Sequence, residues 1–304
     1  MTLIFIGGAT ATGKSELAVS LAQRLQAEIV NADSMQLYRG MNIGTAKLSI
    51  NERAGVPHHL LDVVEVSQDV NVSWYQGQAR STIDDLLARR VPVIVVGGTG
   101  FYMKAILDDL HFPETEPEVR EKLAKEAEAI GGAAMHQRLT VLDPAAAAAI
   151  PAENLRRVIR ALEVIEITGK PFTANLPREN STKYPQALHF GLTVERAVLD
   201  ARVERRVDQM FERGLVGEVE TLIGAGLLEG RTARAALGYA QSISLLGGEI
   251  SLDQALASTK LATRQYIRRQ ETWFNRDQRI IWLGSDASTL SERVLKIEKA
   301  ILTS

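Results

Sequence analysis

The chain has 304 residues, of which 45% are hydrophobic and 24% are charged, and its formal net charge is −2. This composition is typical of a globular protein with one large domain or two modest ones, and the balanced charge excludes a general electrostatic attraction to nucleic acid. The sequence contains no cysteine, which excludes disulfides, thiolate catalysis and cysteine-ligated zinc. With no secretory signal and no apolar run of membrane-spanning length, we expect a cytoplasmic protein.

A phosphate-binding loop follows the first predicted strand. The apolar run at residues 3–6 predicts a buried strand, and the spacing of Leu17, Leu21 and Leu25 predicts a helix. The intervening residues fit the pattern G-x-x-x-x-G-K-[ST], in which backbone N–H groups and the lysine bind an anion and the serine hydroxyl can hold Mg²⁺. A glycine turn with a surface lysine is the weaker alternative. The sequence therefore predicts a di- or triphosphate site formed by Gly8, Ala9, Thr10, Ala11, Thr12, Gly13, Lys14 and Ser15.

A second predicted strand, residues 28–31, ends just before Asp33. Ligands of open α/β sheets lie beyond the carboxyl ends of the strands, so Asp33 is a candidate site carboxylate, with a turn or helix-cap aspartate as the alternative. Gln36 is either a second polar contact or a surface residue. His58 and His59 indicate a metal site only weakly, because adjacent ligands are poorly placed for one ion. A short strand is expected at residues 60–64.

The next predicted helix and strand lead to a glycine-rich turn. Ser73 is the expected N-cap of a helix that reaches about residue 89. The strand predicted at residues 91–96 ends in Gly97-Gly98-Thr99-Gly100, where nucleotide-hydrolysing P-loop proteins commonly carry an acidic residue that helps to hold Mg²⁺. Phosphate binding is thus predicted without the usual apparatus for activating water, and Thr99 is a candidate phosphate contact or part of a simple strand-to-helix turn. The inner face of the helix that begins at Ser73 is predicted to carry Trp74, Ile83, Leu86 and Leu87.

Residues 113–188 carry helix signals and no strand signal, and residues 189–193 resume the sheet. The predicted helices cover residues 118–130, 134–142 and 154–168, with an alanine-rich turn between the last two. Arg156, Arg157 and Arg160 project from the third helix, either toward backbone phosphates or toward Glu153 and Glu163 on a solvated surface. The predicted fold class is therefore α/β, with a P-loop NTPase-like parallel sheet core at residues 1–112 and 189–304 and an inserted all-helical domain at 113–188.

Arginines and aromatic residues alternate in a late helical segment, residues 264–274. This pattern suits phosphate contact with base stacking, and it equally suits an amphipathic helix with solvated arginines and core aromatics. An earlier helix, predicted at residues 200–213, is expected to expose Arg202, Arg205 and Arg206. A last strand at residues 279–283 and a closing helix from residue 290 complete the predicted elements.

Six motifs in this order resemble the bacterial tRNA dimethylallyltransferases, also called tRNA isopentenyltransferases, over nearly the whole chain. The motifs are residues 8–15, 33–38 with 44–47, 97–102, 157–163, 238–239 and 269–274. The commonest loop of the family has proline at the position of Ala9 and serine at that of Thr12. Neither difference touches the glycines, Lys14 or Ser15.

The resemblance implies transfer of a dimethylallyl group from its diphosphate to N6 of the adenosine 3′ of the anticodon, position 37, in tRNA. It implies that Asp33 is the general base and that Thr99 hydrogen-bonds the oxygen between carbon and phosphorus. Lys14, Arg202 and Mg²⁺ on Ser15 would neutralise the departing diphosphate. The adenine would have to leave the anticodon stack to reach this site.

The resemblance also implies tRNA as a partner, with the helical insertion closing on the anticodon stem-loop, and we expect a monomer without membrane contact. A small-molecule kinase is one alternative, but it leaves residues 33–36 and the arginine clusters without a role. An adenylate isopentenyltransferase that makes a free cytokinin-type product is the other, and it should not need the insertion. The implied tRNA contacts are Asp33, Ser34, Met35, Gln36, Thr99, Arg120, Arg156, Arg157, Arg160, Arg234, Gly238, Tyr239, Arg268, Arg269, Gln270 and Trp273.

Overall fold

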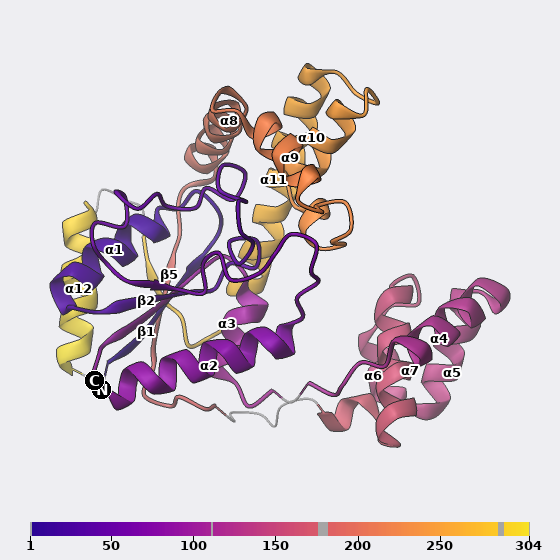
Figure 1. Ribbon diagram of the computed structural model, residues 1–304. Helices are drawn as coiled ribbons and strands as arrows, with labels where there is room; N and C mark the ends of the chain where they lie inside the picture. The colour runs from indigo at the N-terminus through magenta and orange to yellow at the C-terminus, as the bar shows by residue number, and fades with distance from the viewer. Residues whose placement is uncertain (1, 111, 176–181, 285–288, 304) are drawn as a thin grey trace. The chain divides into compact units, whose positions relative to one another are not determined.

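The computed structural model describes residues 2–110, 112–175, 182–284 and 289–303. Within these ranges the strands form a parallel sheet in the order β3-β2-β4-β1-β5-β6 (Figure 1). The strands are β1 (Leu3–Gly8), β2 (Glu28–Asn31), β3 (His58–His59), β4 (Val93–Val96), β5 (Leu188–Leu192) and β6 (Ile281–Leu283). The predicted α/β class with a parallel sheet is confirmed.

Helices cover both faces of the sheet, as a parallel sheet with apolar residues on both faces requires. On one face, alternate residues of β1 pack with α1 (Lys14–Leu25) and α12 (Leu290–Thr303), which lie together in Figure 1. On the other face, Phe5 packs with α2 (Val72–Ala88), α3 (Gly100–Leu107) and Phe274. The ring of Phe274 occupies the space that a side chain at Gly7 would need.

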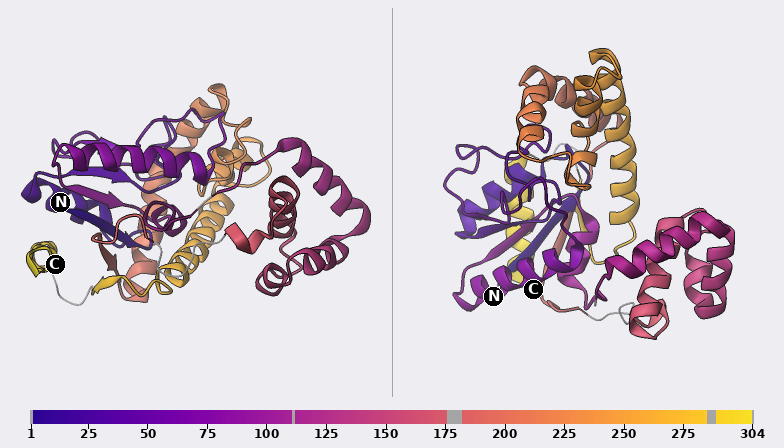
Figure 2. Two further views of the ribbon diagram at one scale, coloured as in Figure 1. Left: turned by 90° about the horizontal axis from the view of Figure 1, so that it is seen from below. Right: turned by 45° about the vertical axis from the view of Figure 1, so that its right-hand side comes forward.

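A group of helices follows β5. It consists of α8 (Arg196–Glu212), α9 (Leu215–Gly224), the short 3-10 helix η2 (Ala233–Ala235), α10 (Tyr239–Leu246) and α11 (Leu252–Phe274). Ser251 caps α11 through reciprocal hydrogen bonds with Gln254. Figure 2 shows α9 and α10, in orange, beside the long α11, whose last residue is Phe274. Thus α11 extends from the α10 packing surface to the core of the sheet.

The chain divides into two compact units. One consists of residues 108–183, and the other consists of residues 1–107 and 184–304. The expected insertion, 113–188, begins and ends a few residues later, and its residues 176–181 lie outside the described ranges. The core of this unit includes Leu123, Met135, Leu139, Val158 and Leu162. Its helices are α4 (Pro117–Ile130), α5 (Gly132–Leu142), α6 (Pro144–Ala149), α7 (Leu155–Thr168) and the 3-10 helix η1 (Phe172–Asn175). None of the helices in the described ranges is long and apolar enough to cross a membrane.

Two local predictions near the middle of the core are wrong. The predicted strand at residues 60–64 is absent among the described residues, because Leu60 and Asp62 have φ values of 59° and 55°, which place them in the left-handed region. The N-cap of α2 is Asn71, not Ser73, since the Asn71 side chain accepts the N–H of Trp74 at 2.8 Å.

The buried face of α2 also differs from the predicted one. Trp74 is 39% exposed, and Leu87 is only partly buried. The buried residues of α2 are Tyr75, Ala79, Ile83 and Leu86. The predicted alanine-rich turn is also wrong in type, since it forms α6, whose N-cap Asp143 accepts the N–H of Ala146 at 3.0 Å.

Candidate active site

Three loops meet at the carboxyl edge of the sheet, where β2, β4 and β1 end next to one another. The loop after β4 is hydrogen-bonded to both neighbours, since Gly97 donates to the carbonyl of Ile6 and Thr99 to that of Ala32, each at 3.3 Å. Gly97 lies so close to the Ala32 carbonyl that no side chain would fit there. This packing places the loop with Thr99 between the phosphate loop and the segment with Asp33.

The phosphate loop curls through three residues with positive φ: Gly8 at 138°, Ala11 at 65° and Gly13 at 93°. A side chain at Gly8 would strike the carbonyl of Leu192. Because Gly13 has no side chain, it caps α1 without a side-chain hydrogen bond, so the first-turn N–H groups face the loop as an anion site requires.

Polar side chains of the loop converge on one carbonyl. Thr12 Oγ1 and Lys14 Nζ both donate to the carbonyl oxygen of Ala9, at 2.9 Å and 2.5 Å. Arg202 Nη1 of α8 donates to the carbonyl of Ala11 at 3.3 Å, so this exposed side chain reaches the loop from another helix. The structure therefore brings Arg202 to the predicted phosphate site.

Lys14, Asp33 and Arg206 influence one another electrostatically. Burial lowers the pKa of Lys14 to about 7, an effect that Asp33 opposes and Arg206 increases. Burial also lowers the pKa of the Arg206 guanidinium, and Asp33 opposes this too. Two basic groups and one carboxylate thus share one partly buried site.

Sequence reasoning missed Arg206 as a site residue and expected it on an exposed face. Its Nε is buried and has no hydrogen-bond partner within the described ranges. Arg202 and Arg206 are four residues apart on α8, so they lie on the same side of the helix. That spacing was the available signal, because Arg202 was already expected at the loop.

Hydrogen bonds within its own turn orient Asp33. Asp33 Oδ1 accepts the N–H of Met35 at 2.9 Å, and the N–H of Asp33 donates to Asn31 Oδ1 at 3.0 Å. The buried Asn31 amide also donates to the carbonyls of Asp33 and Leu60, each at 3.0 Å. Among the described residues, no hydrogen bond reaches the other carboxylate oxygen of Asp33, so that oxygen can accept a proton from a ligand.

The charge of Asp33 influences three tyrosine hydroxyls. Tyr75 and Tyr102 are stacked, with ring centroids 4.0 Å apart and planes at 21°. Burial raises the pKa of both hydroxyls and raises that of Tyr266 to about 12, and in each case Asp33 adds to the rise. All three phenols therefore remain protonated near neutral pH.

Thr99 and Gln270 link the loops. The N–H of Ser34 donates to Thr99 Oγ1 at 3.3 Å. Gln270, which is 5% exposed, accepts the N–H of Thr10 at 2.9 Å and donates to the carbonyl of Gly98 at 2.8 Å. Gly98 and Gly100 leave room for the Gln270 amide and for the Trp273 ring, which explains these two glycines of the turn.

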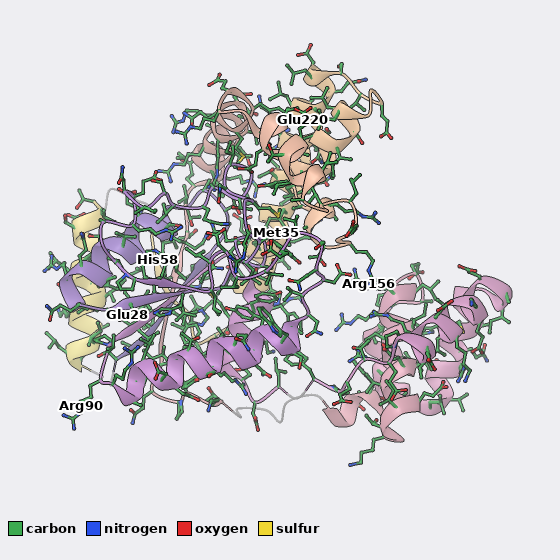
Figure 3. All side chains as sticks on the ribbon, in the orientation of Figure 1. Glu28, Met35, His58, Arg90, Arg156 and Glu220 are labelled. Atoms are coloured by element: carbon green, nitrogen blue, oxygen red, sulfur yellow. The ribbon has the colours of Figure 1, made fainter. Side chains whose placement is uncertain are left out.

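The residues predicted to contact tRNA differ in exposure. The exposed ones are Arg156 (labelled in Figure 3), Arg157, Arg234, Arg268 and Arg269. The partly buried ones are Asp33, Ser34, Met35, Gln36, Thr99, Arg120, Arg160 and Trp273. Gly238, Tyr239 and Gln270 are buried, and the hydroxyl of Tyr239 and the amide of Gln270 are hydrogen-bonded inside the protein. Because these three residues are buried, we expect them to have structural roles.

Arg160 is used within its own unit. Its guanidinium donates to the carbonyls of Pro113 and Glu114, at 2.7 Å and 3.3 Å, and forms an ion pair of 2.9 Å with Glu163. The Glu163 side chain is completely buried, so this pair is not the solvated surface pair that we considered as an alternative. Arg157 of the same helix is exposed.

The exposed end of α11 carries a hollow of about 270 Å³ that is lined by Arg268, Arg269, Thr272, Trp273 and Arg276. Arg276, just past the helix, was not singled out from the sequence. Three guanidinium groups around one indole suit a phosphate chain with a base stacked beside it.

In the described ranges, no three histidine or acidic side chains lie close enough together to hold a metal ion. His58 Nδ1 lies 2.8 Å from the carbonyl of Val56, and His59 Nε2 lies 2.6 Å from the Glu28 carboxylate. The two histidines therefore have separate structural partners.

Comparison with known proteins shows the family of this chain. The family model described as IPP transferase matches residues 36–277. A tRNA dimethylallyltransferase of Thermobifida fusca is 55% identical over 302 residues, covering 97% of this chain and 94% of the relative. The full-length tRNA isopentenylpyrophosphate transferase of Bacillus halodurans is 37% identical, with a TM-score of 0.72 and coverage of 99% and 96%. A eukaryotic dimethylallyltransferase acting on tRNA is 27% identical, with a TM-score of 0.85 and coverage of 99% and 79%. This chain belongs to the IPP transferase family.

Proposed function

We propose that this protein transfers the dimethylallyl group of dimethylallyl diphosphate to N6 of the adenosine 3′ of the anticodon, position 37, in tRNA. The observation that carries the proposal is the position of Asp33 near the phosphate loop, where its charge affects the pKa values of Lys14 and Arg206. A general base and an anion site next to each other are what a transfer from a diphosphate to a neutral amine needs. The relatives named for this reaction span nearly the whole chain.

The diphosphate end of the substrate would lie in the loop of residues 8–15. Backbone N–H groups at the start of α1 would hold the phosphate oxygens, and Lys14 would turn from the Ala9 carbonyl toward them. Arg206, whose Nε is buried without a partner in the described ranges, and Arg202 would supply further positive charge. These donors stabilise the leaving group as its negative charge develops.

At the other end, the N6 nitrogen attacks the allylic carbon of the substrate. The new N–C bond forms as the C–O bond to diphosphate breaks, and the bonding electrons leave with the diphosphate. The proton lost from N6 goes to Asp33, whose Oδ1 accepts the N–H of Met35 while its other oxygen has no hydrogen bond among the described residues. Thr99, beside Ser34, would donate to the bridging oxygen.

Mg²⁺ is the metal ion that we propose for this site. Ser15, in the first turn of α1, offers a hydroxyl oxygen, and the described residues offer no cluster of acidic or histidine ligands. Such a sparse set of oxygen donors fits Mg²⁺, which usually takes most of its ligands from substrate phosphates and water. Bound there, the ion would neutralise charge on the departing diphosphate.

The tRNA would meet exposed arginines in each unit. We propose Arg268, Arg269 and Arg276 on the hollow of α11 as contacts to phosphates, with Trp273 as a stacking surface. On α7 we propose Arg156 and Arg157. A cytoplasmic location follows from tRNA as the substrate and remains a prediction, as does the monomeric state.

One assay separates this function from its alternatives. The protein is incubated with radiolabelled dimethylallyl diphosphate and with unmodified tRNA, AMP or ATP in parallel. Label in tRNA alone, lost when the target adenosine is replaced by guanosine, supports the proposal. Label in AMP or ATP would instead assign an adenylate isopentenyltransferase. A small-molecule kinase would transfer phosphate from ATP and no label.

A further inference from the structure

Glu218 of α9 fills a nest of backbone N–H groups in the loop of residues 42–45. Its carboxylate accepts the N–H of Asn42 at 3.1 Å and that of Ile43 at 2.8 Å and 3.1 Å, and the N–H of Gly44 lies 3.5 Å away. Successive N–H groups that converge in this way form an anion-binding concavity. Here the anion is a side chain of the protein itself, contributed by a helix that lies far along the chain.

Tyr239 completes the nest. Its hydroxyl donates to Glu218 Oε1 at 2.6 Å, and its side chain is completely buried. Gly44 faces the Tyr239 ring, where a side chain would not fit. Tyr239 of the motif Gly238-Tyr239 therefore packs against Gly44, the first residue of the motif at 44–47. This packing gives both motifs a structural role that needs no substrate contact.

The loop held in this way sets the orientation of Gln36. Gln36 Nε2 donates to the carbonyl of Thr45 at 3.1 Å, and Thr45 Oγ1 donates to the carbonyl of Met41 at 2.6 Å. A carbonyl can only accept, so the Gln36 nitrogen must face Thr45 and Oε1 must point the other way. Gln36 is three residues after Asp33 and is partly exposed, so Oε1 remains available as an acceptor beside the site.

We propose that Glu218 and Tyr239 are positioning residues for tRNA recognition. They hold the loop of residues 42–45 so that Gln36 presents Oε1 to the exocyclic amino group of a tRNA base. The proposal rests on the proposed function, because it needs tRNA as the substrate. Base edges are discriminated by such donors and acceptors, and a small misplacement of the reading group lowers turnover strongly.

The first test compares Glu218→Gln and Tyr239→Phe with Glu220→Gln in the labelled transfer assay. Glu220 is an exposed residue two positions along α9 (Figure 3), which makes it a matched control. Glu218→Gln puts an NH₂ group among N–H donors, so kcat/KM for tRNA should fall roughly 10- to 100-fold. Tyr239→Phe removes one donor and should lower it roughly threefold to tenfold. The Kd for dimethylallyl diphosphate and the rate of Glu220→Gln should stay within about twofold of the unaltered protein, as expected for an exposed surface substitution.

The second test asks whether Glu218 acts through Gln36, which a purely structural role would not require. In a Gln36→Ala background, Glu218→Gln should cost less than about threefold in kcat/KM, because the group that it positions is already gone. An unchanged loss in that background, or a Glu218→Gln variant that behaves like Glu220→Gln, would overturn the proposal. If Glu218→Gln does not fold, Tyr239→Phe is taken through the same cycle with the same criteria. Absence of tRNA transfer by the unaltered protein would instead overturn the proposed function.

Discussion

Gln270 and Thr10, 260 positions apart in the chain, are joined by a hydrogen bond of 2.9 Å from the Thr10 N–H to the Gln270 side-chain oxygen. The nitrogen of the same amide donates to the carbonyl of Gly98 at 2.8 Å. One buried side chain of α11 therefore fixes the phosphate loop against the loop that carries Thr99.

This double contact predicts a specific effect of Gln270→Glu. The carboxylate still accepts the N–H of Thr10, but it places an oxygen opposite the Gly98 carbonyl and leaves that contact repulsive. We expect kcat/KM to fall roughly 10- to 100-fold, the usual cost of losing a buried hydrogen bond with an unfavourable replacement. Steady-state transfer kinetics measure this, with Gln265→Glu on the exposed side of α11 as the control. Equal kinetics for the two variants would remove Gln270 from the positioning of the loops.

Lys14 predicts a pH dependence of diphosphate binding. Burial lowers the pKa of Lys14 to about 7, so the amine of the free protein loses its charge as the pH rises above that value. A bound anion favours the charged form and raises this pKa, so binding takes up a proton. Affinity should therefore level off below about pH 7 and fall by at most tenfold per pH unit above it.

Calorimetric titration with a non-reactive thio analogue of dimethylallyl diphosphate, between about pH 6 and pH 9, measures this slope. Lys14→Arg keeps its charge over the whole range and should lose the Lys14 part of the slope. The diphosphate's own titration affects both proteins alike and cancels in the comparison. Parallel pH profiles for the two proteins would show that the Lys14 ammonium does not titrate in the binding equilibrium.

The sheet and the phosphate loop could be predicted from the sequence because both produce patterns among residues that are close together in the chain. Residues 3–25 contain a strand, a glycine loop and a helix in direct succession, and the pattern of each is complete within a few residues. The site residues that were missed depend on contacts between distant segments. Arg206 influences Lys14 because α8 packs beside the phosphate loop, and the sequence indicates this only through the spacing of Arg206 from Arg202.

Motifs also did not distinguish residues that touch a substrate from residues that hold others in place. Gln270 and Tyr239 stand in motifs that the family resemblance linked to tRNA, yet both are buried with internal partners. Arg160 and Arg157 are equivalent in the sequence pattern, but only Arg160 reaches carbonyls of residues 113–114. The φ values of Leu60 and Asp62, which exclude the predicted strand, were likewise not encoded in their apolar and polar pattern.

The two arginines of α7 should respond differently to substitution. Arg160→Ala leaves the buried carboxylate of Glu163 without its ion-pair partner, so we expect a lower Tm for the unfolding of the helical unit. Arg157→Ala removes an exposed charge and should leave Tm unchanged, while the slope of log K for tRNA binding against log salt flattens by roughly 0.7 to 0.9. Calorimetry and fluorescence titrations at several salt concentrations measure the two effects. A salt slope that Arg157→Ala leaves intact would place the phosphate contact elsewhere, first on Arg268 and Arg269.

In the proposed reaction, Asp33 takes the N6 proton while the neighbouring loop holds the departing diphosphate. Single-turnover transfer of labelled dimethylallyl to tRNA by Asp33→Asn tests it most directly, because the amide keeps the size of the carboxylate and can still accept the N–H of Met35. We predict that the transfer rate falls roughly 10²- to 10⁴-fold, the usual span for a general base, while tRNA affinity stays within a few-fold. A single-turnover rate near that of the unaltered protein would show that Asp33 is not the general base.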